Sequence, residues 1–142
     1  MLKGIPKFLS PELLKILCEM GHGDDIVIAD ANFPSETCGK RVIRAEAAGA
    51  EQMLTAVMDL IPLDDYVDDN FVLIETPASY TEEPPIWESF RKIANERDGN
   101  VHEKQIDRFD FYERAKNAYA VIATGEEALY SCVILKKGVF RP

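Results

Sequence analysis

His22 is the side chain of this chain best suited to acid–base chemistry, because only two histidines occur among its 142 residues. An imidazole has an ordinary pKa of about 6.5, so it can both give and take a proton near neutral pH. His22 lies between two glycines, just before the apolar run 25–29 and the aspartate Asp30 that follows it. A histidine in such a turn can also do no more than cap a neighbouring carbonyl. The segment alone leaves both interpretations open.

A second group of side chains has the types that a sugar site needs. A polyhydroxyl ligand is held by a carboxylate, a planar cation and aromatic surface, and Asp30, Arg108, Tyr112 and Tyr130 are of these types. Each also has an ordinary structural interpretation. Asp30 could cap a turn, Arg108 could pair with a neighbouring carboxylate, and the tyrosines could lie at the edge of the core. Composition and spacing do not bring these four residues together.

Other kinds of chemistry lack the residues that they require. The glycine turn at 123–126 has neither the lysine of a P-loop nor a Gly-x-Gly-x-x-Gly pattern, and its glutamates would repel phosphate. His22 and His102 have no metal-ligand spacing with cysteines or carboxylates. Cys38 is surrounded by no nucleophile signature, so a buried thiol is the simpler interpretation. We therefore expect no metal and no cofactor.

The composition limits the partners and the compartment. With 16 basic and 25 acidic residues the net charge is -9, which repels nucleic acids and anionic membrane surfaces. The three cysteines are widely separated and form no paired motif, which fits a reducing compartment. No apolar stretch has the length of a signal peptide or a membrane span. We expect a cytoplasmic protein that binds neither nucleic acid nor membrane.

Alternating helical and strand patterns predict an α/β fold. The unbroken, β-branched runs are typical of strands buried on both faces of a parallel sheet. The pattern predicts strands at 25–30, 41–44, 71–75, 118–123 and 129–135, and helices at 11–20, 49–61, 85–97 and 108–117. No linker or repeat divides the chain. We expect one layered domain over residues 1–142, with a mostly parallel central sheet flanked by helices.

Five motifs follow one another along the chain: Gly-His-Gly-Asp at 21–24, Asp-Ala-Asn-Phe-Pro at 30–34, and the segments 108–114, 123–126 and 129–138. In this order, over essentially the whole length, they resemble the family of L-fucose mutarotase and D-ribose pyranase. The resemblance implies a sugar mutarotase that interconverts α and β anomers by ring opening, without a cofactor. It implies that His22 is the proton donor and that the sugar is bound by Asp30, Arg108, Tyr130, Ser131 and Cys132.

The mechanism that the resemblance implies is acid–base catalysis. A protonated His22 would donate to the ring oxygen, and the exposed carbonyls at the end of the first helix would favour its cationic form. The arginine at 108 favours the fucose branch of the family, because the ribose branch tends to have a histidine there. The resemblance also implies a ring-shaped homo-oligomer, a decamer, with the sugar site near a subunit boundary.

Cys132 departs from the family pattern, which usually has an asparagine at this position. A thiol is a poor donor and a poor acceptor, so the identity of the sugar stays open. Two other interpretations also stay open. The chain could be a non-catalytic monosaccharide-binding or regulatory module of the same fold, or an interaction subunit with no sugar ligand. The roles of His102 and Tyr112 are likewise undetermined by the sequence.

Overall fold

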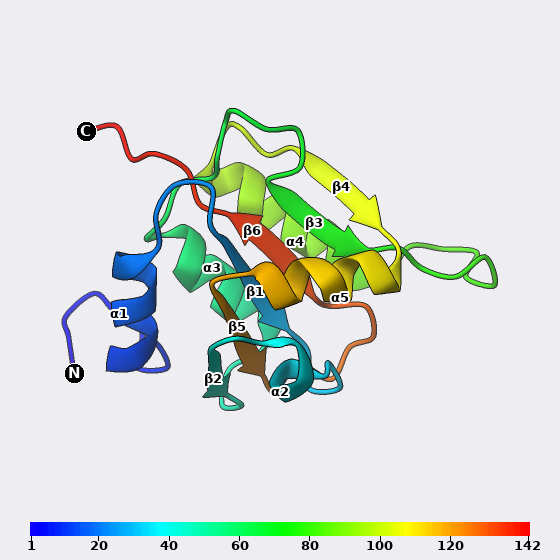
Figure 1. Ribbon diagram of the computed structural model, residues 1–142, viewed down its shortest axis with the longest axis horizontal. Helices are drawn as coiled ribbons and strands as arrows, with labels where there is room; N and C mark the ends of the chain where they lie inside the picture. The colour runs from blue at the N-terminus through cyan, green and yellow to red at the C-terminus, as the bar shows by residue number, and fades with distance from the viewer.

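A six-stranded sheet forms the centre of the molecule, and its strand order does not follow the sequence (Figure 1). The computed structural model describes residues 1–142. The sheet has the order β2-β5-β1-β6-β3-β4 and consists of β1 (Asp25–Ala29), β2 (Val42–Ala45), β3 (Phe71–Ile74), β4 (Glu103–Ile106), β5 (Ala120–Thr124) and β6 (Val133–Lys136). Only β6 runs against its neighbours, since it is antiparallel to β1 and β3. This confirms the predicted mostly parallel sheet.

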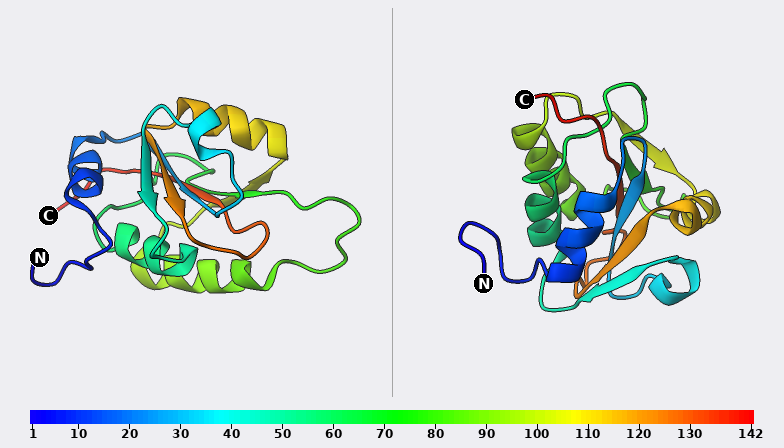
Figure 2. Two further views of the ribbon diagram at one scale, coloured as in Figure 1. Left: turned by 90° about the horizontal axis from the view of Figure 1, so that it is seen from below. Right: turned by 60° about the vertical axis from the view of Figure 1, so that its left-hand side comes forward.

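Five helices flank the sheet: α1 (Pro11–Glu19), α2 (Ser35–Cys38), α3 (Ala50–Met58), α4 (Pro85–Arg97) and α5 (Arg108–Asn117). In Figure 2, α3 and α4 cover one face of the sheet, and α2 and α5 cover the other. None of these helices has the length and apolar character needed to cross a membrane.

Two apolar cores follow from this layering. Alternate residues of β1 point to opposite faces, so Ile26 and Ile28 join the larger core, whereas Val27 and Ala29 join the smaller one. The larger core contains the fully buried Trp87 from α4. Burial on both faces explains why β1 is apolar from Ile26 to Ala29, as the sequence pattern predicted.

The structure differs from the predicted elements at three places. The helix α2 and the strand β4 were not predicted. β4 has the sequence Glu-Lys-Gln-Ile and lies at the edge of the sheet, paired only with β3, so it has no need of an apolar pattern. The strand predicted at 129–135 begins only at Val133, because Tyr130 adopts a left-handed backbone with φ of 56°.

Candidate functional site

The predicted sugar-binding residues gather at the carboxyl end of the sheet, the end at which the strands of common direction finish. Asp30 directly follows β1, and Arg108 begins α5 just after β4. Because β6 runs the opposite way, its start lies at this same end, and Tyr130, Ser131 and Cys132 immediately precede it. Open α/β sheets usually bind their ligands at the carboxyl ends of their strands.

Asp30 and Cys132 are in direct contact. The backbone N–H of Asp30 donates to Sγ of Cys132 over 3.3 Å, and the Asp30 carboxylate accepts the N–H of Asn32 at 2.9 Å. The Cys132 side chain is buried, with a relative exposure of 1%. Burial raises the pKa of the Cys132 thiol well above its ordinary value, and the charge of Asp30 raises it further. Cys132 is therefore a neutral thiol that offers an apolar surface and a weak acceptor.

A cavity of about 680 Å³ lies at this end of the sheet, within the usual size range of small-molecule sites. Its lining comes from the loop after β3, the start of α5 and the turn before β6, and consists of Ile74, Glu75, Thr76, Pro77, Asp107, Arg108, Phe109 and Tyr130. The lining thus combines polar and charged groups with apolar surface. This mixture suits a ligand with hydroxyl groups on one side and carbon on the other.

Arg108 is the cation of this cavity, and its donors are available to a ligand. Its guanidinium carbon lies 4.8 Å from the centre of the Phe109 ring, and no carboxylate pairs with it. The neighbouring Asp107 is used otherwise, because its side chain accepts the N–H groups of Phe109 and Asp110 at 2.9 and 3.1 Å. Asp107 thereby caps α5 instead of neutralising Arg108.

A smaller cavity of about 180 Å³ lies on the other side of an aromatic row. Asp30 and Phe33 line it, whereas Phe109 lines the larger cavity. The Tyr112 ring makes edge contacts with both phenylalanines, at centroid distances of 5.5 Å to Phe33 and 6.5 Å to Phe109. Tyr112 thus connects the walls of the two cavities, and Asp30 lies at one cavity while Arg108 and Tyr130 lie at the other.

Ser131 does not offer its hydroxyl to either cavity. The residue is fully buried, and its Oγ donates to the Ala128 carbonyl over 2.6 Å. Its neighbour Tyr130 is half-buried, and the Tyr130 ring lines the larger cavity. Of the predicted triplet, Tyr130 presents its side chain to the cavity and Ser131 holds the turn together.

His22 lies at the opposite end of the sheet from these residues. It is exposed and precedes β1, whereas Asp30 follows β1. The five residues of β1 between them span roughly 16 Å at the usual rise of a strand. A single chain therefore does not bring His22 to the sugar-binding residues. The histidine is presented on the surface, away from them.

The turn that carries His22 is firmly held by two lysines of the C-terminal segment. The Nζ atom of Lys137 donates to the carbonyls of Leu17 at 2.8 Å and Met20 at 2.6 Å, and Lys136 Nζ donates to the Gly23 carbonyl at 3.1 Å. These contacts correct one expectation from the sequence. The carbonyls of Leu17 and Met20, at the end of α1, are not left exposed but already accept hydrogen bonds from Lys137.

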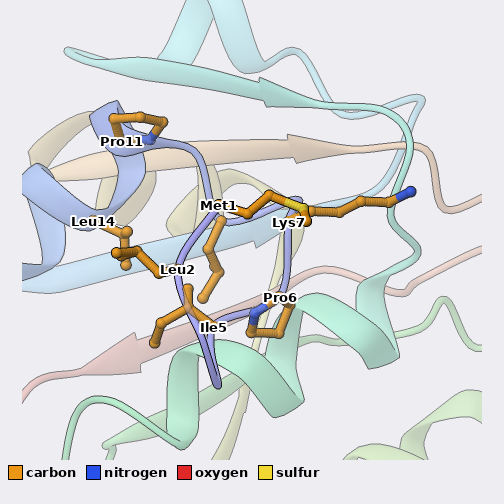
Figure 3. A pocket seen from close by; sticks show the side chains of 8 residues that line it. Met1, Leu2, Ile5, Pro6, Lys7, Pro11 and Leu14 are labelled. Carbon is orange, nitrogen blue, oxygen red and sulfur yellow. The ribbon is translucent and has the colours of Figure 1, made fainter.

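A separate pocket lies at the N-terminal segment (Figure 3). Its volume is about 300 Å³, and apolar side chains such as Leu2, Ile5 and Leu14 dominate its lining, with Lys7 as the charged member. None of the predicted site residues lines it. It lacks the carboxylate and guanidinium groups that would hold a sugar.

Several cavity residues were not predicted from the sequence. Glu75 directly follows β3, so the rule that ligands bind at the carboxyl ends of strands could have identified it. Asp107 follows β4, whose polar sequence concealed the strand. Phe109 had no signal beyond its place next to Arg108.

The chain belongs to the RbsD / FucU transport protein family, whose model matches residues 3–140. It is 50% identical to the fucose mutarotase of Mus musculus, over 96% of this chain and 94% of that protein. It is 42% identical to the L-fucose mutarotase of Histophilus somni (strain 2336), over 98% of this chain and 97% of that protein. The crystal structure of the fucose mutarotase from Streptococcus pneumoniae in complex with L-fucose is similar throughout. Its TM-score is 0.94 at 44% identity, covering 99% of this chain and 100% of that one. Membership of this family confirms the resemblance found in the sequence.

Proposed function

We propose that the chain is an L-fucose mutarotase, an isomerase that interconverts the α and β anomers of the free sugar. The observation that carries this proposal is the full-length similarity to a fucose mutarotase that was crystallised with L-fucose, at a TM-score of 0.94. The carboxyl end of the sheet supports it. Arg108 and Tyr130 line a cavity with free donors there, and Asp30 lines the smaller cavity on the other side of the aromatic row.

The chemistry is ring opening and closure. The ring oxygen must gain a proton while the anomeric hydroxyl passes its own proton to water, and both transfers reverse after the aldehyde group rotates about the C1–C2 bond. His22 donates the proton to the ring oxygen, and Asp30, Arg108 and Tyr130 bind hydroxyl groups of the sugar. Because mutarotation already proceeds slowly in water, positioning and acid–base assistance of roughly 10²–10⁴-fold suffice, and no cofactor takes part.

A second copy of the chain supplies His22 to each site. His22 and Asp30 lie at opposite ends of β1, so one chain cannot bring both to one sugar. A head-to-tail contact between copies joins the end of the sheet that carries His22 to the carboxyl end of the next copy. Head-to-tail contacts that close give rings. We therefore propose a ring-shaped homo-oligomer, a decamer by family resemblance, in which each sugar lies at a subunit boundary.

The composition of the cavity fits a 6-deoxy sugar. L-Fucose carries a methyl group where related hexoses carry a hydroxymethyl group, and such a methyl group needs apolar surface. Ile74, Pro77 and Phe109 supply that surface in the larger cavity, where the guanidinium of Arg108 lies against the Phe109 ring. This apolar character favours L-fucose over a fully hydroxylated aldose.

The protein acts in the cytoplasm on a free monosaccharide and needs neither nucleic acid nor membrane. Its Cys18, Cys38 and Cys132 are all unpaired, in keeping with a reducing compartment. Its net charge of -9 disfavours polyanions.

Saturation-transfer NMR on L-fucose and D-ribose tests the proposed function. With catalytic amounts of protein, magnetisation should pass between the α and β signals of L-fucose faster than in buffer, and the anomeric ratio should stay unchanged. His22→Ala should remove most of the exchange, while the matched variant His102→Ala, which changes the other histidine, should retain it. Sugar binding without accelerated exchange would make the chain a non-catalytic sugar-binding module, and no binding of any aldose would leave an interaction subunit.

A further inference from the structure

Tyr130 has a backbone conformation that its own sequence does not favour. It is the one non-glycine residue of the chain with a positive φ, 56°, in the left-handed region that side chains with a Cβ seldom adopt. Such a conformation persists only where the surrounding structure holds it. Tyr130 also carries a ring that lines the larger cavity. What holds its backbone therefore decides where its ring and hydroxyl lie.

The buried Trp87 holds the backbone of Tyr130 from within the core. Its indole Nε1–H donates to the Tyr130 carbonyl over 2.8 Å. Trp87 belongs to α4, has a relative exposure of 1% and is packed in the larger core, so the donor cannot move without disturbing the helix. The carbonyl that it binds belongs to a residue of the turn just before β6. The hydrogen bond ties the rigid part of the fold to the wall of the cavity.

Tyr80 holds the ring of Tyr130 from the outside. The two rings meet edge to face, with centroids 5.0 Å apart and an interplanar angle of 79°. Tyr80 comes from the long loop between β3 and α4, which projects from the body of the molecule in Figures 1 and 2. It does not line the cavity of Tyr130 but a neighbouring one of about 580 Å³, together with Pro84 and Leu129. Tyr80 thus supports the Tyr130 ring away from the cavity of Arg108.

The loop that carries Tyr80 is anchored at its far end. Arg91 of α4 forms paired hydrogen bonds with Glu83 at the end of the loop, at 2.6 and 3.0 Å, and with Glu103 of β4, at 2.7 and 3.0 Å. The paired geometry fixes both carboxylates on one guanidinium. The loop therefore approaches Tyr130 from a defined direction.

We propose that Trp87 and Tyr80 are positioning residues, which place the Tyr130 hydroxyl against the sugar without touching it. The inference rests on the proposed function, since it assumes that Tyr130 binds the substrate. Trp87 holds the Tyr130 carbonyl, and Tyr80 holds the Tyr130 ring. The Tyr130 hydroxyl oxygen then keeps one position, and only its proton rotates. Loss of either support lets the ring turn away from the cavity and weakens sugar binding, while proton transfer from His22 is affected much less.

Double-mutant cycles on the exchange reaction test this assignment. Trp87→Phe removes the N–H donor and keeps an aromatic ring, and Tyr80→Leu removes the supporting ring at an exposed site where folding is not at risk. Each should raise the KM for L-fucose severalfold and change kcat by less than twofold. In a Tyr130→Phe background, where no hydroxyl remains to be placed, each effect on KM should largely disappear. Phe90→Leu, a buried change in the same helix, and Tyr66→Leu, an exposed tyrosine elsewhere, should leave KM unchanged.

The outcomes separate the positioning role from the proposed function. If Trp87→Phe and Tyr80→Leu raise KM by the same factor with and without the Tyr130 hydroxyl, or do not raise it at all, the positioning role is overturned while the mutarotase proposal stands. If Tyr130→Phe itself leaves KM unchanged, Tyr130 is no sugar-binding residue, and the positioning role falls with it. If no variant and no wild-type protein accelerates exchange, the proposed function has failed.

Discussion

Asp30 and Cys132 meet through a hydrogen bond in which the Asp30 backbone N–H donates to the Cys132 sulfur over 3.3 Å. The contact joins the end of β1 to the start of β6, two strands that are neighbours in the sheet. It also gives the buried Cys132 side chain a structural role. The thiol accepts the first N–H after β1, and the buried Cys132 lines neither of the two cavities.

Replacing Cys132 tests this contact. Cys132→Ala leaves the Asp30 N–H without its acceptor, so the free energy of unfolding should fall by about 1–3 kcal/mol. The KM for L-fucose should also rise, because the backbone that carries Asp30 loses its support. Cys38→Ala is the matched control, since Cys38 is buried in the same smaller core but lines neither cavity and makes no contact with the Asp30 N–H. Denaturant unfolding and exchange kinetics measure the two effects. Equal changes in KM for the two variants would refute a role of Cys132 in the site.

The three cysteines should differ in their reactivity. Burial raises the pKa of Cys38 and of Cys132, so both stay protonated at neutral pH, whereas Cys18 is exposed. Iodoacetamide at pH 7.5 should therefore modify Cys18 alone over the time in which free cysteine reacts completely, and exchange activity should be retained. Mass spectrometry of the modified peptides checks this. Rapid modification of Cys132 in the folded protein would show that its thiol is neither buried nor protonated.

Lys137 should matter for turnover more than for sugar binding. Its ammonium group holds the carbonyls of Leu17 and Met20 next to the His22 turn. Lys137→Met releases that turn, so kcat should fall about tenfold because a catalytic group is displaced, while KM stays near that of the wild type. Lys104→Met, on the exposed edge strand β4, is the control and should have no effect. A selective rise in KM for Lys137→Met would place its influence at the sugar-binding end instead.

Asp107 should stabilise the protein in a pH-dependent manner. The N–H groups of Asp110 and Phe109 bind its carboxylate and lower its pKa from the ordinary value of 3.8. Since its folded-state pKa is the lower one, its stabilising effect is present above about pH 4 and is lost as the pH falls through the folded-state value. Asp107→Ala should therefore have a lower Tm than the wild type at pH 6, and the gap should narrow towards pH 3. A gap that stays constant over this range would contradict the capping role of the charged form.

Much of the fold could be predicted from the sequence, because the central strands are buried on both faces. Runs such as 26–29 and 71–74 are apolar without interruption, a proline lies in the first turn of α4, and Asp107 caps the start of α5. Elements at the edge of the sheet do not show this apolar pattern. β4 needs no apolar face, and the turn at Tyr130 has neither glycine nor asparagine to mark its left-handed backbone, so the predicted strand continued through it.

The site was predictable in type but not in arrangement. Asp30, Arg108 and Tyr130 have the chemistry of a sugar site, yet only the strand order brings the start of β6 next to the end of β1. The resemblance to the family supplied their roles. It did not reveal that β1 separates His22 from Asp30, a separation that follows from the fold of a single chain.

Mixing two inactive variants tests most directly whether each site takes His22 from one subunit and its sugar-binding residues from the next. His22→Ala and Arg108→Ala are each expected to lack exchange activity as pure proteins. When they are unfolded together, refolded as a 1:1 mixture and assayed on L-fucose, head-to-tail sites formed at random should restore about one quarter of the wild-type activity, because one junction in four joins an intact His22 to an intact Arg108. A chain that carries both substitutions, mixed 1:1 with the wild type, should also leave about one quarter of the sites active. If each chain formed its own site, about one half of the sites would stay active. Mixed proteins that co-assemble but stay inactive would contradict the account.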